Sequence, residues 1–152
     1  MLVTTKIKLL TNEEQHRILK ETMIRFNEAC NYISQIAFEN KTHSQVKVHK
    51  LCYYDVKAQF GLSSQMAIRA IGKVVETYKA DKEPEKPHTF GLLSAIVYDQ
   101  RNMSVSIDHV SLVTLEGRIK IPLVVSGYHQ GIIKQGRVKG QADVVLVDNV
   151  FY

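Results

Sequence analysis

The spacing of hydrophobic residues changes twice along the chain and divides it into three parts. Residues 2–10 (LVTTKIKLL) alternate polar and apolar side chains, a period of two that predicts a β-strand. From about residue 11 to residue 80, apolar residues recur at intervals of three and four, which predicts helices. After residue 88 the period returns to two. The pattern therefore predicts one strand, a helical region and a second set of strands.

Three helices are expected within the helical region. Thr11 and Glu14 have the spacing of a capping box that begins the first helix. Gly61 suits the left-handed position after the second helix, and Ser63 or Ser64 caps a third helix over residues 65–79. The residues expected to face the core are Leu19, Met23, Phe26, Cys30, Ile33 and Ala37 in the first helix, Val48, Leu51, Cys52, Val56 and Phe60 in the second, and Met66, Ala67, Ala70, Ile71, Val74 and Tyr78 in the third.

The second set of strands is punctuated by turn residues. The strands are expected near residues 92–98, 103–107, 110–115, 118–124 and 142–147. Glu116-Gly117 is expected to make a two-residue hairpin turn. Asp148-Asn149 is expected to make another, because Asx residues tolerate positive φ. The glycine-punctuated segment GYHQGIIKQGRVKG between the last two strands is expected to be a basic loop.

The first strand must pair with the later ones, since the helical region offers none. We therefore predict an α+β fold, a Greek-key-like β-barrel interrupted after its first strand by a three-helix bundle. Residues 1–10 and 88–152 would form the barrel and residues 11–80 the helical insertion. The charged segment 81–87 contains two prolines and would be a linker.

Composition and charge narrow the class of protein. The chain is 45% hydrophobic and 23% charged, which is typical of a soluble globular protein, and no apolar run reaches the ~18 residues of a membrane span. Cys30 and Cys52 stand among apolar helical residues, which indicates buried thiols in a reducing compartment, and the N-terminus lacks a signal-peptide core. We expect a cytoplasmic protein.

The positive charge is concentrated in the first half of the chain. Residues 1–80 hold 12 Lys and Arg against 7 Asp and Glu, whereas residues 81–152 hold 8 of each. This excess favours a polyanionic partner, with a solvated helical surface as the alternative.

Motifs for catalysis or cofactor binding are not found in the sequence. There is no P-loop, no GxGxxG, no CxxC and no HExxH, and His43 and His49 are six residues apart, which suits no metal site. Asp99, Asp108 and Asp143 have the spacing of turn and edge residues rather than of a two-metal nuclease site. We expect no cofactor, no metal and no catalysis by this chain on its own.

Five stretches occur in an order that resembles a known family. They are FNEACNYISQIAFEN, YYDVKAQFGLSSQMAIRAIGKVVETYK, IVYDQR, SLVTLEGRIKIPL and ADVVLVDNVFY. Together they are similar to the N-terminal half of the OrfB/TnpB proteins of insertion sequences, which are transposon-encoded, RNA-guided DNA nucleases related to the type V CRISPR effectors. The resemblance implies a wedge domain, which is a β-barrel, interrupted by a helical recognition domain, in agreement with the predicted fold.

The resemblance also implies partners and a missing part. Family members continue from the NVFY strand into a RuvC nuclease domain with a zinc ribbon, and neither is present here. The chain is therefore expected to be a fragment that binds without cutting. Its implied partners are a structured guide RNA and the duplex DNA beside the target, and a separate nuclease half is a further partner left open.

Several residues are candidates for contacts with these partners. Gln65 at a helix N-terminus is suited to pair with adenine, with Ser64, Arg69 and Lys73 beside it. The alternative is a capped, solvated helix. The other candidates are Lys47 and Lys50 in the second helix, Tyr98, Gln100 and Arg101 at the start of the sheet, and Lys134, Arg137 and Lys139 in the glycine-rich segment.

A second reading of the sequence belongs to another class. Val150 to Tyr152 is a strand of only three residues, and an incomplete strand leaves backbone amides and carbonyls unpaired. The chain would then be a non-catalytic interaction or inhibitory fragment that forms a homodimer through this exposed edge strand.

Overall fold

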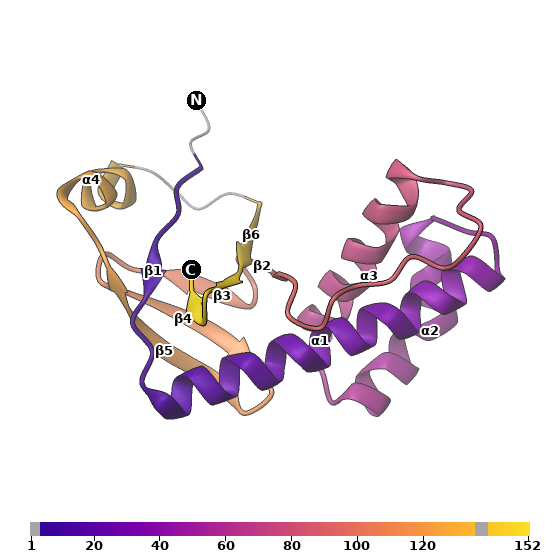
Figure 1. Ribbon diagram of the computed structural model, residues 1–152, viewed down its shortest axis with the longest axis horizontal. Helices are drawn as coiled ribbons and strands as arrows, with labels where there is room; N and C mark the ends of the chain where they lie inside the picture. Colours follow the sequence, from indigo (N-terminus) through magenta and orange to yellow (C-terminus); the bar gives the residue numbers. More distant parts are fainter. Residues whose placement is uncertain (1–3, 136–139) are drawn as a thin grey trace.

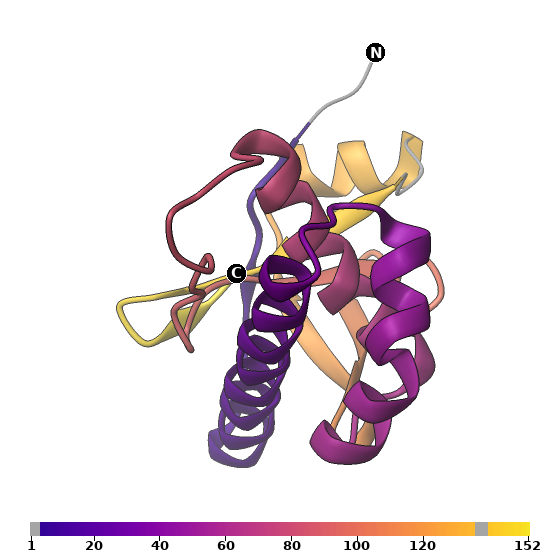
Figure 2. The same ribbon diagram turned by 90° about the vertical axis from the view of Figure 1, so that its right-hand side faces the viewer.

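The computed structural model describes residues 4–135 and 140–152, apart from the side chain of Gln135. The fold is α+β. Three helices gather at one end and the strands at the other, and the long helix α1 (Glu13–Glu39) runs beneath both (Figures 1 and 2). Within these residues, no helix combines the length and the apolar character needed to cross a membrane.

Helix α1 begins one residue later than predicted. The side chain of Asn12 accepts a hydrogen bond from Gln15 N at 2.8 Å, and Gln15 Oε1 accepts one from Asn12 N at 3.1 Å. Asn12 and Gln15 therefore form the capping box, and the prediction of Thr11 and Glu14 was wrong. Glu14 instead pairs with Arg17 one turn along the helix. An Asn–Gln pair offers the same donors and acceptors as the Thr–Glu pair one position earlier, so the spacing alone did not distinguish them.

Helices α1, α2 (Gln45–Phe60) and α3 (Ser64–Ala80) share one core with the strands. The stripes predicted in α1 and α3 are buried. In α2 the core face is narrower than predicted, because Leu51 is 44% exposed and only Val48, Cys52 and Val56 are buried. Gly61 ends α2 with φ of 63°, as predicted, and Ser63 caps α3. Cys30 and Cys52 are buried free thiols.

In the part of the chain that the structure describes, the strands form three hydrogen-bonded groups. In the four-stranded sheet the order is β1 (Lys8–Leu9), β5 (Gly117–Val124), β4 (His109–Thr114) and β3 (Met103–Val105), all antiparallel. Strand β2 (Ile96–Asp99) pairs with β6 (Gln141–Val144), and β7 (Leu146–Val147) pairs with β8 (Val150–Phe151). In the described part of the strand predicted at residues 2–10, only Lys8–Leu9 is a strand, and it joins strands that follow the helices. Closure of these groups into a barrel remains a prediction.

One of the two expected hairpin turns is correct and the other is shifted. Asp148 and Asn149 both have positive φ, 49° and 63°, and join β7 to β8 as predicted. The β4–β5 turn is Leu115-Glu116, because Gly117 already pairs with Thr114. The Thr114 hydroxyl fixes this register by donating to Gly117 O at 2.7 Å and accepting from Glu116 N at 3.1 Å.

Part of the segment expected to be a loop is a helix, α4 (Gly127–Gln135). Ser126 Oγ accepts from His129 N and His129 Nδ1 accepts from Ser126 N, each at 3.3 Å, which is the reciprocal pattern of a capping box. The loop prediction gave the glycines too much weight and overlooked this cap.

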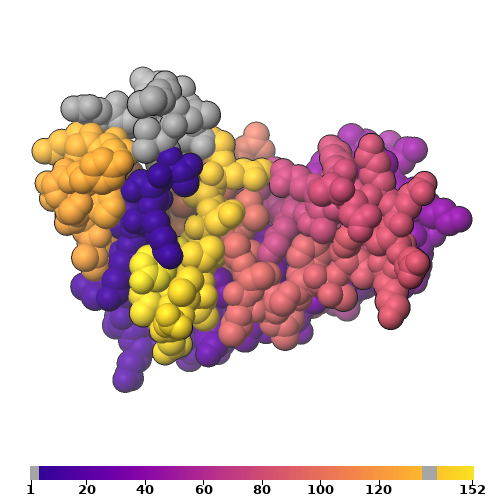
Figure 3. Space-filling model, turned by 45° about the horizontal axis from the view of Figure 1, so that its top comes forward, coloured from indigo at the N-terminus to yellow at the C-terminus, as the bar shows by residue number. Residues whose placement is uncertain are grey.

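The two ends of the described chain lie together. Tyr152 exchanges two backbone hydrogen bonds of 3.0 Å with Val145, so pairing continues beyond β8. The C-terminal residues, in yellow, lie against the N-terminal segment, in indigo, in the space-filling view (Figure 3). The C-terminal strand, which the sequence predicted to be an exposed edge, is therefore paired on the side that faces β7.

Candidate nucleic-acid interface

The turn that follows β2 is held by Asp99. Asp99 Oδ1 accepts a hydrogen bond from Arg101 N at 2.8 Å, and Asp99 N donates to Asn102 Oδ1 at 2.8 Å. Asn102 is buried, and its backbone N–H donates to Asp99 O at 3.2 Å. An Asx side chain that bonds the backbone two residues onward is a recognised way of fixing a turn. Gln100 and Arg101 are exposed at its tip.

The first turns of helix α3 dock against this same carboxylate. Gln65 Nε2 donates a hydrogen bond to Asp99 Oδ2, and Arg69 Nε lies 3.3 Å from the same oxygen as an ion pair. Arg69 and Asp99 retain 20% and 16% of their side-chain exposure, so the contact lies at the edge of the core. Two groups of residues predicted separately, one in the helix and one at the start of the sheet, thus meet.

Arg118 on β5 completes the group and was missed by sequence reasoning. Its Nη2 donates to Arg101 O at 3.2 Å and its Nη1 to Ser111 Oγ at 3.3 Å. The available signal was its place directly after the hairpin turn in SLVTLEGRIKIPL, but the strand pattern did not reveal which turn it faces. We call Gln65, Arg69, Asp99, Arg101 and Arg118 the Asp99 cluster. The cluster contains three arginines and one carboxylate, an excess of positive charge that favours an anionic ligand.

The ammonium group of Lys73 is fully hydrogen-bonded within the protein. Its ammonium donates to Asn27 Oδ1, Ser94 Oγ and Ala95 O at 2.9, 3.0 and 2.7 Å. An ammonium has three N–H donors, so these contacts use all of them. Burial lowers the pKa of Lys73. The structure therefore gives Lys73 a structural role, in place of the predicted contact with phosphate.

Two further candidates, Tyr98 and Ser64, make hydrogen bonds to other residues of the protein. Tyr98 is fully buried and donates its hydroxyl to Val113 O at 2.8 Å, and burial raises its pKa, so it is a core residue. Ser64 Oγ is exposed and accepts from Lys57 Nζ at 2.9 Å, while the capping role falls to Ser63. The burial of Tyr98 corrects its sequence prediction, whereas a binding role for the exposed Ser64 stays a prediction, and Ser63 is one of the two caps that the sequence allowed.

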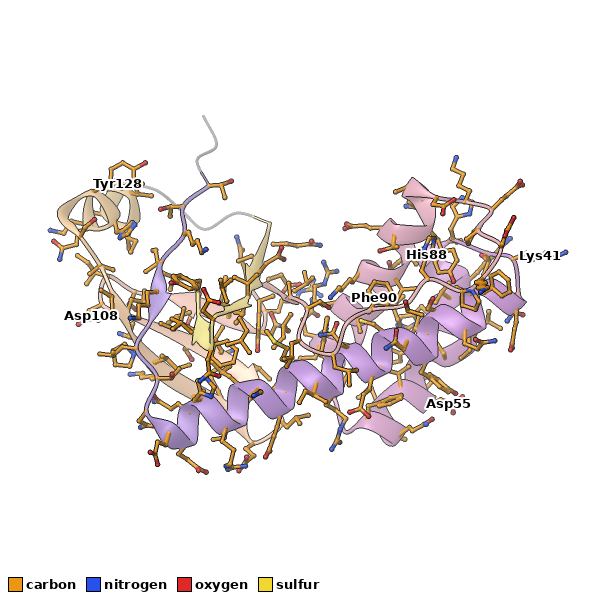
Figure 4. The ribbon with its side chains drawn as sticks, viewed as in Figure 1. Lys41, Asp55, His88, Phe90, Asp108 and Tyr128 are labelled. Carbon is orange, nitrogen blue, oxygen red and sulfur yellow. The ribbon has the colours of Figure 1, made fainter. Side chains whose placement is uncertain are left out.

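The remaining candidates lie away from the Asp99 cluster. Lys47 and Lys50 are exposed on α2, in the helical end of the molecule. Lys134 is exposed on α4, the helix that carries Tyr128, at the opposite end of the molecule (Figure 4). Arg137 and Lys139 fall outside the described residues. Of the candidates that lie in the described residues, the structure therefore brings together Gln65, Arg69 and the turn residues.

Acidic side chains of the described residues do not gather into a metal site. Across residues 4–135 and 140–152, no group of three or more His, Cys, Asp or Glu could hold a metal ion. Asp99 is engaged by α3, and Asp108 accepts from His109 Nδ1 at 2.8 Å, a bond that lowers the pKa of Asp108. What the Asp99 cluster offers chemically is binding, through guanidinium and amide groups, to an anion or a base edge.

Comparison of the sequence with known proteins gives no matching family model and no significant match to a curated protein. The resemblance to the OrfB/TnpB proteins therefore rests on the five sequence stretches alone.

Proposed function

We propose that this protein binds nucleic acid through the Asp99 cluster, as the wedge and recognition domains of an OrfB/TnpB-like protein do. Its partners would be duplex DNA and a structured guide RNA, and it would bind them in the cytoplasm without cutting them. The observation that carries the proposal is that the side chains of Gln65 and Arg69, from a helix N-terminus, contact the Asp99 carboxylate, which also holds the backbone N–H of Arg101 in the sheet turn.

Gln65 is positioned to read a base. One N–H of its amide is committed to Asp99, which fixes the side chain. Its Oε1 and second N–H remain for a ligand, and these are the acceptor and donor that bidentate pairing with adenine requires. Preorganisation of this kind lowers the entropy lost on binding.

The arginines are suited to the phosphate backbone. Arg69 Nε lies 3.3 Å from Asp99 Oδ2 in an ion pair without a hydrogen bond, which leaves its two Nη groups as the fork that binds a phosphate oxygen pair. Arg101 is exposed at the turn, with Arg118 bonded to its carbonyl. Such contacts set affinity and register, while Gln65 supplies sequence preference.

A salt series tests this proposal. We would measure binding of the full chain to a labelled duplex and to a labelled RNA hairpin by fluorescence anisotropy. Affinity should fall steeply with salt, and Arg101→Ala or Arg118→Ala should each reduce the slope for duplex DNA by about one. Lys8→Ala, an exposed change on β1, is the matched control and should leave the slope unchanged. Salt-independent binding, or slopes unchanged in both arginine variants, would reject the proposal.

A further inference from the structure

The outer face of helix α2 exposes apolar side chains that the fold leaves uncovered. Tyr54 is 81% exposed and Val46 is 63% exposed. The helix packs inward through Val48, Cys52 and Val56. Residues four apart share one side of a helix, so Val46, Lys50 and Tyr54 form a row on the opposite side. We call Val46, Lys47, Lys50 and Tyr54 the α2 outer face.

A hollow adjoins this row. It has a volume of about 280 Å³ and is lined by Gln45, Val46, His49, Lys50 and Ile68, mostly through apolar surface. Val46 and Lys50 thus belong both to the outer face and to the hollow, which lies where α2 meets α3. The hollow can accept one apolar side chain of a ligand, while Tyr54 offers a second apolar contact one turn beyond Lys50.

The charge on this face has one sign. Lys47 and Lys50 are exposed, and neither ammonium makes an ion pair among the described residues. The first turn of α2 contains no acidic residue, and the one acid in the helix is Asp55, at the flank of the row. A ligand for this face therefore carries negative charge beside its apolar groups.

The aromatic residues of α2 favour a protein ligand over a single-stranded nucleic acid. Stacking successive bases requires free aromatic faces. His49 stacks on Tyr53 with ring centroids 4.2 Å apart, and Lys57 Nζ lies 5.6 Å from the centroid of the same ring. Tyr54 is the exposed ring of the helix, and it makes an edge-to-face contact with Tyr53 at a centroid distance of 5.1 Å. The aliphatic side chain of Val46 gains nothing from a phosphate backbone.

We propose that the α2 outer face docks an acidic amphipathic helix of a partner protein. One apolar side chain of that helix would fill the hollow beside Val46 and Ile68, and a second would pack on Tyr54. Carboxylates flanking them would pair with Lys47 and Lys50. This mode, an amphipathic helix on a complementary apolar surface, is a common form of peptide recognition. The proposal does not depend on nucleic-acid binding by the Asp99 cluster.

The experiment uses the full chain and a synthetic, fluorescein-labelled helical peptide of about four turns, with Leu along one face and Glu elsewhere. The comparison peptide has the same composition with the Leu residues spread around the helix. Binding is followed by anisotropy, and an oligouridylate competes in a separate arm.

Tyr54→Ser and Lys50→Glu test whether the α2 outer face binds the peptide. Their matched controls are Tyr128→Ser, a change at the far end of the molecule where Tyr128 is 67% exposed, and Lys8→Glu on β1 (Figure 4).

The amphipathic peptide should bind saturably and the rearranged peptide much more weakly. Tyr54→Ser and Lys50→Glu should each weaken binding about tenfold, as truncation of a central interface residue does, while the two controls bind like the parent. All four side chains are exposed, so thermal unfolding should be unchanged in every variant. Equal binding of the two peptides, unchanged binding in the two test variants, or no saturable binding would overturn the proposal. Displacement of the peptide by oligouridylate, with Tyr54→Ser weakening the oligonucleotide instead, would overturn it in favour of RNA.

Discussion

At the scale of single residues, Lys73 joins two parts of the molecule. Its ammonium connects Asn27 on α1 with Ser94 and Ala95 in the segment that leads into β2. It also lies 5.7 Å from the ring centroid of Phe26 and 5.4 Å from that of Phe90. A cation held by three oxygens and two rings has a structural task that no exposed lysine of the helices shares.

We predict that Lys73→Met lowers the free energy of unfolding by about 1–3 kcal/mol, because it leaves buried acceptors without a donor. Urea denaturation measures the loss. Lys47→Met, at an exposed lysine, is the control and should change stability by less than about 0.5 kcal/mol. A Lys73 variant as stable as the control would show that its contacts are dispensable.

The helical spacing predicted which side chains of a helix are buried, whereas it did not predict which residues form hydrogen bonds with each other across the fold. The apolar stripe of α1 was read correctly because the 3.6-residue period fixes which side chains share a face. The burial of Tyr98 and the internal contacts of Lys73 depend on segments distant in sequence, which periodicity does not describe. Leu51 was misjudged because α2 touches the core along only a narrow face.

At the scale of elements, a row of polar side chains on α1, which we call the polar ladder, forms hydrogen bonds with the backbone of the segment that leads into β2. Asn31 Nδ2 donates to Phe90 O at 3.0 Å, and Asn31 Oδ1 accepts from Phe90 N at 2.7 Å. Asn27 Nδ2 donates to Ser94 O and Ser34 Oγ donates to His88 O. The ladder fixes the path from the bundle to β2, where His88 and Phe90 follow the helices (Figure 4).

We predict that Asn31→Ala releases this segment locally. The amide of Phe90 should exchange with solvent faster by about tenfold or more, since its hydrogen-bond acceptor is lost. Hydrogen exchange followed by NMR would measure it. Gln35→Ala, one turn further along α1 and bonded there only to Glu39, is the control. Unchanged protection of Phe90 would mean that other contacts hold the segment.

The elements themselves were largely foreseeable, and their boundaries were not. Three helices and the later strands were found from hydrophobic period, while the α1 cap and the β4–β5 turn each moved by one residue. In both cases a side-chain hydrogen bond, from Gln15 and from Thr114, selected between adjacent registers that have similar composition. Helix α4 was missed because its cap depends on the side chain of His129.

At the scale of the whole molecule, the helices are inserted between strands that pair with each other. Lys8 and Leu9 pair with Val124 and Leu123, more than a hundred residues later in the chain. The N-terminal part of α1 also depends on the sheet, because Thr22 Oγ1 accepts from Leu115 N at 3.2 Å and His16 bonds to Asn149 O at 3.0 Å.

We predict that a truncated chain of residues 1–81 loses this support unevenly. Residues 8–24 should lose hydrogen-exchange protection, because their partners in the sheet are removed. The part of α1 that packs on α2 and α3 should keep more protection. A truncated chain whose Leu10 amide stays as protected as in the full chain, where it donates to Pro122 O at 2.8 Å, would contradict this.

The sequence could predict the α3 residues and the turn residues of the Asp99 cluster as separate candidates, but not that they contact each other. Gln65 and Arg69 were selected from a helix start and Arg101 from the start of the sheet, on separate grounds. Asp99 was noted only as a turn residue, and its role as the shared acceptor depends on how α3 packs against β2. Long-range packing of this kind leaves no local signal in the chain.

The most direct test of the account is the binding of Gln65→Ala and Arg69→Ala to a randomised duplex library, with an RNA hairpin present in place of the guide RNA. Gln65→Ala should cost about 1–3 kcal/mol at the preferred motif and relax the sequence preference. Arg69→Ala should weaken all sequences alike and lower the salt slope by about one. Gln59→Ala, an exposed change on α2, should behave like the parent. If the Gln65 and Arg69 variants also bind and discriminate like the parent, the Asp99 cluster is not the DNA-binding surface.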